Sequence, residues 1–123
     1  MTENHTMTKG KIVLVPFPYD DLSVNKLRPA ACLTNPMGAR RHVLLAYITS
    51  HIPTHLQETD IQIDVSHPNF AATGLRQSSI IRLHHLVTVS TVVIQRELGK
   101  LPTEIQQLMS EKNCAINCLA NIG

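Results

Sequence analysis

Hydrophobic residues recur along the chain in short runs of the kind that form β-strands. Residues 12–17 are apolar at consecutive positions, which is typical of a strand covered on both faces, and Pro16 and Pro18 mark its end because proline cannot donate to the ladder. Between residues 61 and 65, Ile and Val alternate with Gln and Asp, as in a half-buried strand. Further strands are predicted at residues 29–33, 42–49 and 79–89, the last bent near two adjacent histidines.

The period becomes helical near the C-terminus. Apolar residues recur there at intervals of three and four, from Leu101 and Ile105 to Ile116 and Leu119. Short strands followed by one helix favour a mainly β (α+β) fold, with a small, strongly bent antiparallel sheet or barrel, over alternating βαβ units. We expect residues 1–9 to form a flexible tail and residues 10–123 a single domain.

Charge and cysteine content narrow the class of protein only a little. Eleven Lys and Arg against nine Asp and Glu give a net charge of +2, which neither requires nor excludes a nucleic-acid partner. The three cysteines are an odd number and Cys32 lies in an apolar strand, which suits a reduced protein. Apolar runs are too short to span a membrane, and the N-terminus lacks a signal-like stretch. These features predict a cytoplasmic protein.

Arg28 and Pro29 open the second predicted strand after a polar loop. The proline ring restricts the residue before it to extended conformations, so the backbone of Arg28 is constrained before any tertiary contact forms. A guanidinium held in this way suits a phosphate, because it is always charged and offers five donors in a rigid fork. Taken alone, the dipeptide is more often a surface arginine at the start of a strand.

Three segments together are more specific than this dipeptide. The first is GKIVLVPFPYDDLSVNKLRPAACLT at residues 10–34, with an apolar strand, a loop that carries D-L-S, and then R-P. The second is AYITS at residues 46–50, and the third runs from TGL at residues 73–75 to LVTV at residues 86–89. In order and spacing they resemble the PemK/MazF toxins of bacterial type II toxin-antitoxin systems. The resemblance covers roughly residues 10–115 and implies an SH3-like barrel.

The resemblance also implies a function and assigns residues to it. It predicts an endoribonuclease that cuts single-stranded RNA, forms a homodimer and is neutralised by a cognate antitoxin. Arg28 matches the catalytic arginine of the family, and Thr49 matches its catalytic threonine. Without the family, Thr49 reads as a β-branched residue at a strand end. RNA supplies its own nucleophile, the 2′-OH, so this chemistry needs no metal and no cofactor.

Other residues are candidates for RNA binding. Arg82 and His84 are two apart on one predicted strand, so they project from the same face about 7 Å apart, a span that fits a phosphate or an adjacent nucleotide. Some family members carry an acidic residue where His84 stands, which leaves open whether His84 is catalytic. The other residues assigned to RNA are Tyr19, Lys26 and Ser50, and Phe17, Tyr19 and Tyr47 are candidates to stack on bases.

Potential metal sites are unconvincing. His51 and His55 have helical ligand spacing but lie in a predicted loop. His84 and His85 are neighbours in a predicted strand, where alternation sends them to opposite faces. Asp20 and Asp21, the only adjacent acidic pair, would also point apart.

Two functions other than RNA cleavage stay open at the level of sequence. The same barrel occurs in gyrase-poisoning toxins, which bind a protein and catalyse nothing. A homologue that has kept only antitoxin binding is the other.

Overall fold

The computed structural model of the chain describes residues 7–16 and 26–122, with side chains as far as Lys112. Within this part, one antiparallel sheet of six strands carries most of the structure, in the order β4-β5-β3-β2-β1-β6. The strands are β1 (Lys11–Pro16), β2 (Leu27–Cys32), β3 (His42–Thr49), β4 (Asp60–Ile63), β5 (Ser79–Ser90) and β6 (Arg96–Lys100). Two 3₁₀ turns, η1 (Phe70–Thr73) and η2 (Thr91–Val93), and one helix, α1 (Thr103–Ile122), complete it.

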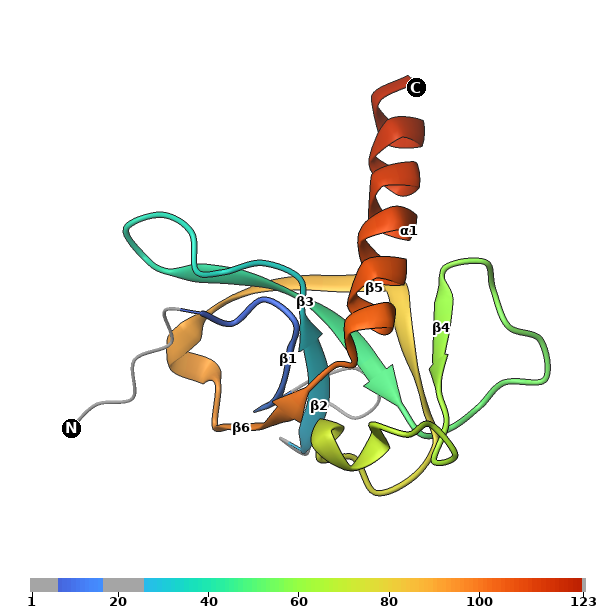
Figure 1. Ribbon diagram of the computed structural model, residues 1–123. Helices are drawn as coiled ribbons and strands as arrows, with labels where there is room; N and C mark the ends of the chain where they lie inside the picture. The colour runs from blue at the N-terminus through green and yellow to red at the C-terminus, as the bar shows by residue number, and fades with distance from the viewer. Residues whose placement is uncertain (1–6, 17–25, 123) are drawn as a thin grey trace.

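The sheet curls into a half-barrel with α1 standing on it (Figure 1). This confirms the predicted fold class, a strongly bent antiparallel sheet with a C-terminal helix. The five predicted strands are present, although β4 ends at Ile63 rather than Val65. β6 was not predicted, because its residues include Arg96, Glu97, Gly99 and Lys100 and show no apolar pattern. Such a composition is found in strands at the exposed edge of a sheet, where β6 lies.

β5 bends at the predicted place, and the pairing register gives the reason. Ala46 of β3 pairs with Leu86, whereas the next residue, Tyr47, pairs with Arg82. Three residues of β5, from Leu83 to His85, are therefore extra between two neighbours on β3. Such an insertion interrupts the ladder and bends the strand. One long strand thus supplies two differently oriented parts of the half-barrel (Figure 1).

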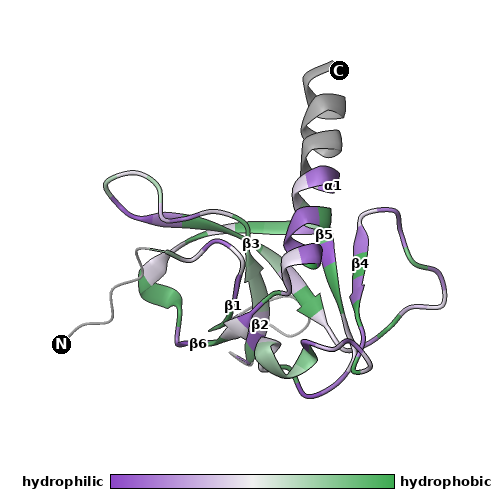
Figure 2. Cartoon of the chain, viewed as in Figure 1, coloured by the Kyte–Doolittle hydropathy of each residue, from purple (hydrophilic) through white to green (hydrophobic). Residues whose placement is uncertain are grey.

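Apolar residues fill both faces of the sheet. Alternate positions of each strand point to opposite faces, so Ile12 joins one hydrophobic cluster and Val13 the other. α1 covers the first cluster with Ile105 and Met109, and Leu101 just before the helix joins them. The second cluster lies on the opposite face of the sheet and contains Val13, Val15, Ala30, Cys32, Val43, Leu45 and Ile94. The hydropathy colouring in Figure 2 shows the same concentration of apolar residues on the strands.

Ordered contacts begin before Gly10. Thr8 is only 3% exposed, its hydroxyl donates to the carbonyl of Thr34, and its N–H donates to Asn35 Oδ1. The N–H of Lys9 donates to the same oxygen. The structured domain therefore includes Thr8 and Lys9, which the sequence pattern assigns to the tail.

The helix is connected to the sheet by polar contacts as well as apolar ones. His67 Nε2 lies 3.0 Å from Glu104 Oε1, and the ammonium of Lys112 donates to the carbonyl of Glu58. Beyond these contacts the helix extends away from the sheet (Figure 1). Among the described residues, no helix is long and apolar enough to cross a membrane.

Candidate functional site

Arg28 of β2 and Thr49 of β3 line the same cavity. The two strands pair next to it, where Ala30 pairs with Tyr47 and Ala31 with Ala46. Arg28 and Thr49 each lie two residues beyond the last of these pairs, Ala30 with Tyr47. Because side chains alternate along a strand, both project from the face that carries Ala30 and Tyr47. β2 begins and β3 ends here, so both residues lie at the ends of two central strands of the sheet (Figure 1).

The cavity, of about 150 Å³, opens at this end of the two strands. Its lining residues are Arg28, Pro29, Ile48, Thr49, Ser50, Leu75, Arg76, Gln77 and Ser79. Since β3 lies between β2 and β5 in the sheet, the cavity straddles the end of β3, with Arg28 on one side and the segment before β5 on the other. The structure thus joins three residues that the sequence assigned to the site: Arg28, Thr49 and Ser50.

The hydroxyl of Thr49 has a defined orientation. Its Oγ1 accepts a hydrogen bond from the backbone N–H of His51 at 3.1 Å. The hydroxyl proton is not used in this bond, so it remains available to donate to a bound group. Thr49 can therefore act as a hydrogen-bond donor toward the cavity that it shares with Arg28.

Arg76 and Gln77 were not predicted as site residues, although both line the cavity. They belong to the segment between η1 and β5 and are exposed. The only signal in the sequence is that Arg76 directly follows the TGL motif, which ends at Leu75. A single arginine in a connection between elements carries little information by itself. Their relevance comes from the folding of the segment against the end of β3.

Local hydrogen bonds hold this segment in place. The side chain of Thr73 is buried, and its Oγ1 donates to the carbonyl of Phe70 at 2.6 Å and accepts from the N–H of Leu75 at 3.1 Å. Gly74 has a φ of +75°, and an added Cβ would lie 2.3 Å from the carbonyl oxygen of Leu98.

Serines fix the other end of the segment. Ser79 Oγ donates to the carbonyl of Gln77, and Ser78 Oγ donates to Asp64 Oδ1 at 2.9 Å. The bond from Ser78, followed by one from the backbone of Ser66, lowers the pKa of Asp64 below its ordinary value. Arg76 therefore lies on a connection tied down at both ends.

Arg82 and His84 lie outside the lining of this cavity. Both approach the carboxylate of Asp60, whose side chain is fully buried: Oδ1 lies 3.3 Å from Arg82 Nε and 3.8 Å from His84 Nδ1. The other carboxylate oxygen accepts the N–H of Gln57 at 2.9 Å. Asp60 is thus a polar anchor between β4, β5 and the loop before β4, which sequence analysis missed because a lone aspartate at a strand start is unremarkable in a sequence.

His84 has a second partner. Its Nδ1 lies 2.8 Å from the hydroxyl of Thr59. Desolvation, followed by electrostatic interactions with His85 and Arg82, lowers the pKa of His84 below its ordinary value of 6.5, and Asp60 opposes this shift. His84 is therefore mainly neutral at pH 7, which suits a hydrogen bond to Thr59 better than an ion pair with Asp60.

The two histidines do not point to opposite faces, and that prediction is wrong. The ring centroids of His84 and His85 are 4.4 Å apart in an edge-on arrangement. The alternation that the prediction assumed is lost in the three-residue insertion of β5. His85 also stacks on Tyr47 with a centroid distance of 6.2 Å. One candidate for base stacking is therefore already in contact with a ring of the protein.

The remaining predicted residues divide into two groups. Lys26 is exposed and precedes β2 directly, close in sequence to Arg28. Phe17, Tyr19, Asp20 and Asp21 lie outside the described residues. Among the side chains that the structure describes, in residues 7–16 and 26–112, no group of three or more His, Cys, Asp or Glu could jointly hold a metal ion.

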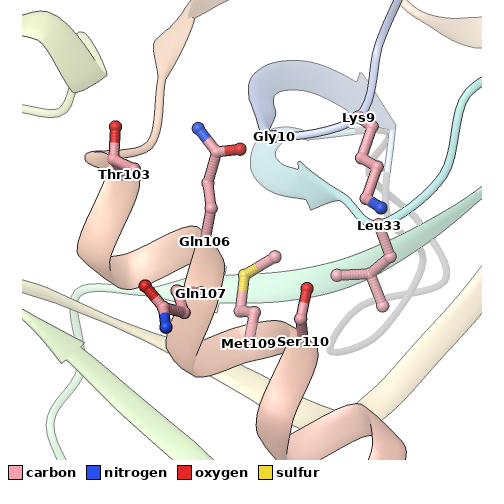
Figure 3. Close-up of a pocket in the computed structure, with 8 residues that line it drawn as sticks. All are labelled: Lys9, Gly10, Leu33, Thr103, Gln106, Gln107, Met109 and Ser110. Atoms are coloured by element: carbon pink, nitrogen blue, oxygen red, sulfur yellow. The ribbon is translucent and has the colours of Figure 1, made fainter.

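A larger cavity of about 250 Å³ lies elsewhere (Figure 3). It is bordered by the first turns of α1, by the residues just before β1 and by Leu33 just after β2. Gln106, Met109 and Ser110 project into it from the helix, opposite Gly10 and Leu33 (Figure 3). Gln106 Nε2 already donates to the carbonyl of Leu101. Arg28 and Thr49 do not line this space, which we regard as a packing gap at the base of the helix.

The half-barrel with one C-terminal helix is the fold of the MazF-like toxins. The family model described as "PemK-like, MazF-like toxin of type II toxin-antitoxin system" matches residues 8–114. The chain therefore belongs to this family of toxins, as the sequence motifs predicted. Membership implies an antitoxin as a partner.

Solved structures agree with this assignment at the level of the fold. The chain is similar to the Mycobacterium tuberculosis toxin MazF-mt6, with 22% sequence identity and a TM-score of 0.60. The similarity covers 82% of this chain and 89% of that protein. No curated protein matches the sequence.

Proposed function

We propose that this protein is a sequence-selective, metal-independent endoribonuclease toxin that cuts single-stranded RNA and is neutralised by a cognate antitoxin. The observation that supports the proposal is that Arg28 and Thr49 line one small cavity, at the start of β2 and the end of β3. At about 150 Å³ the cavity is smaller than pockets that enclose whole drug-sized ligands, which begin near roughly 300 Å³. It suits a phosphate with part of its ribose, while the bases remain outside.

The reaction uses the nucleophile that RNA provides. The 2′-oxygen forms a bond to phosphorus and loses its proton, while the bond from phosphorus to the 5′-oxygen breaks and that oxygen gains a proton. The products are a 2′,3′-cyclic phosphate and a 5′-hydroxyl. Negative charge grows on the non-bridging oxygens during the step, so a preorganised donor there lowers the barrier.

Arg28 and Thr49 have distinct roles in this step. The positively charged guanidinium of Arg28 stabilises the developing charge. The hydroxyl of Thr49, whose oxygen is already engaged by the N–H of His51, donates to a phosphate oxygen. Both groups are fixed by neighbouring strands, so little reorganisation accompanies the reaction.

The other assigned residues contact RNA around this centre. Ser50 lines the same cavity, and exposed Lys26 lies beside Arg28 in the chain. Tyr19, Arg82 and His84 complete the proposed contact set. Arg82 and His84 both lie near the carboxylate of Asp60, at 3.3 and 3.8 Å, and this proximity to each other supports a joint contact with a neighbouring nucleotide. We further propose that the toxin acts in the cytoplasm as a homodimer on mRNA.

Incubation of the purified protein with defined RNA tests the proposal. Cleavage should persist in EDTA, leave a 5′-hydroxyl on the downstream fragment, and fail when only the scissile nucleotide carries 2′-deoxyribose. Loss of activity in EDTA that magnesium restores, with 5′-phosphate ends, would contradict the mechanism. Intact RNA throughout, combined with gyrase inhibition or with antitoxin binding alone, would assign the protein to one of the two non-catalytic alternatives.

Substitutions with matched controls test the two residues. Arg28→Ala should abolish cleavage in a folded protein, and Arg40→Ala, which removes an exposed arginine from the turn at the other end of β2 and β3, should leave it unchanged. Thr49→Val should lower kcat by about 10²-fold, as expected for loss of one transition-state donor. Thr88→Val is the matched control, because Thr88 is an exposed residue of β5 that does not line the cavity, and it should leave kcat unchanged. An active Arg28→Ala variant would remove this arginine from the mechanism.

A further inference from the structure

Arg76 stands out among the cationic residues near the cavity. It lines the cavity with Arg28 and Thr49, it is exposed, and among the described residues no hydrogen bond or ion pair engages its guanidinium. Arg82, by comparison, is paired with buried Asp60. An unpaired guanidinium at the rim of a small polar cavity is available to a ligand.

The position of Arg76 relative to Arg28 favours a ligand with more than one phosphate. The two arginines approach the cavity from either side of the end of β3, from β2 and from the segment before β5. Neighbouring strands are about 4.8 Å apart, so two strand spacings separate the flanking backbones by roughly 10 Å. This separation places two guanidinium groups along a backbone rather than on one oxygen.

The rigidity of the segment adds a second argument. Thr73, Ser78 and Ser79 fix it by side-chain hydrogen bonds, and Gly74 packs too closely on Leu98 to accept a side chain. The long side chain of Arg76 is free to adapt, but its point of attachment is fixed. An attachment point held at both ends allows a specific contact at a smaller entropic cost than a loose loop would.

We propose that Arg76 is a second phosphate-binding residue of this site, which holds the RNA phosphate next to the one that Arg28 engages. The inference rests on the proposed nuclease function and deepens it by assigning a backbone subsite. Arg76 serves binding and not the chemical step, so its loss should raise KM and leave kcat within about twofold. Because the contact is ionic, it should also contribute to the salt dependence of RNA binding.

Binding of a labelled RNA that carries 2′-deoxyribose at its mapped cleavage position tests this directly. Fluorescence anisotropy over a range of salt concentrations gives the slope of log K against log salt. Arg76→Ala should weaken binding at low salt by about 10-fold and reduce the slope by about 0.7, the contribution of one phosphate contact on a single strand. Arg76→Lys should restore the slope, and Arg40→Ala should match the wild-type protein.

The outcomes separate the two proposals. Wild-type protein that cleaves RNA, with an Arg76→Ala variant of unchanged affinity and slope, would overturn the role of Arg76 alone. A variant that loses kcat but keeps its affinity would also overturn it, because Arg76 would then act on the reacting phosphate. Wild-type protein that neither binds nor cleaves RNA would overturn the nuclease proposal and this subsite with it.

Discussion

Replacing Arg82 by methionine tests whether the contact with Asp60 is a buried ion pair that stabilises the fold. Methionine keeps an apolar stem of similar length and removes only the guanidinium. The carboxylate of Asp60 would then remain in a site where its side chain is 0% exposed, while the wild-type Arg82 side chain is 21% exposed. The variant therefore isolates the loss of the counter-charge.

The structure sets the expected size of the effect. Removing one partner of a buried pair costs about 3–5 kcal/mol because a buried charge is left uncompensated. The N–H of Gln57 still donates to the carboxylate, so we expect the lower end, about 3 kcal/mol. Asp60→Asn should cost less, about 1–2 kcal/mol, since Arg82 can turn its partly exposed guanidinium to water.

Urea unfolding followed by circular dichroism measures these free energies. Lys11→Met is a matched control: Lys11 Nζ lies 3.0 Å from Glu97 Oε1, but both side chains are more than a third exposed, so its loss should cost less than about 1 kcal/mol. The double variant Arg82→Met with Asp60→Asn should cost at least about 1 kcal/mol less than the sum of the single variants. Strict additivity, or an Arg82→Met variant no less stable than Lys11→Met, would refute the reasoning.

Three further predictions concern single residues. Gly74→Ala should destabilise the protein by at least about 1 kcal/mol in urea unfolding, because φ is +75° and the new Cβ would meet the carbonyl oxygen of Leu98. Burial raises the pKa of Cys32 to about 12, so peptide mapping should find this thiol unmodified by iodoacetamide at pH 8 in native protein and alkylated in urea; rapid native labelling would contradict its burial. The pKa of His84 is lower in the folded protein than in the unfolded chain, so as pH falls below about 6.5 the unfolded chain takes up a proton before the folded protein does. The free energy of unfolding should therefore decline as pH falls through this range, and His84→Asn should make the decline shallower. An equally steep decline in that variant would assign the effect to another group.

The fold was predictable where the pattern of apolar residues decides the structure. Burial on both faces of β1 and the helical spacing of Leu101, Ile105 and Met109 are local signals, and both appear in the two hydrophobic clusters. β6 was not predictable, because pairing with β1, rather than any apolar pattern of its own, makes these charged residues a strand.

The candidate site was partly predictable for the same reason. Arg28 and Thr49 lie at strand ends within recognisable motifs, so the predicted strands and the resemblance to PemK/MazF toxins were enough to select them as candidates. Arg76 and Asp60 depend on contacts between segments far apart in sequence: Asp60 meets Arg82 only because β4 pairs with β5. The prediction that His84 and His85 point to opposite faces was wrong for a related reason. The insertion in β5 can be recognised only from its pairing with β3.

The cavity at the end of β3 draws on residues near positions 28, 49 and 76, and Ser79 closes its lining. During synthesis, the N-terminal part of the chain leaves the ribosome first, and it lacks the third wall until β5 begins to emerge. A one-residue slip between β2 and β3 would also turn Arg28 and Thr49 away from each other. The proposed site is therefore complete only after the segment before β5 has been synthesised and has packed against the end of β3.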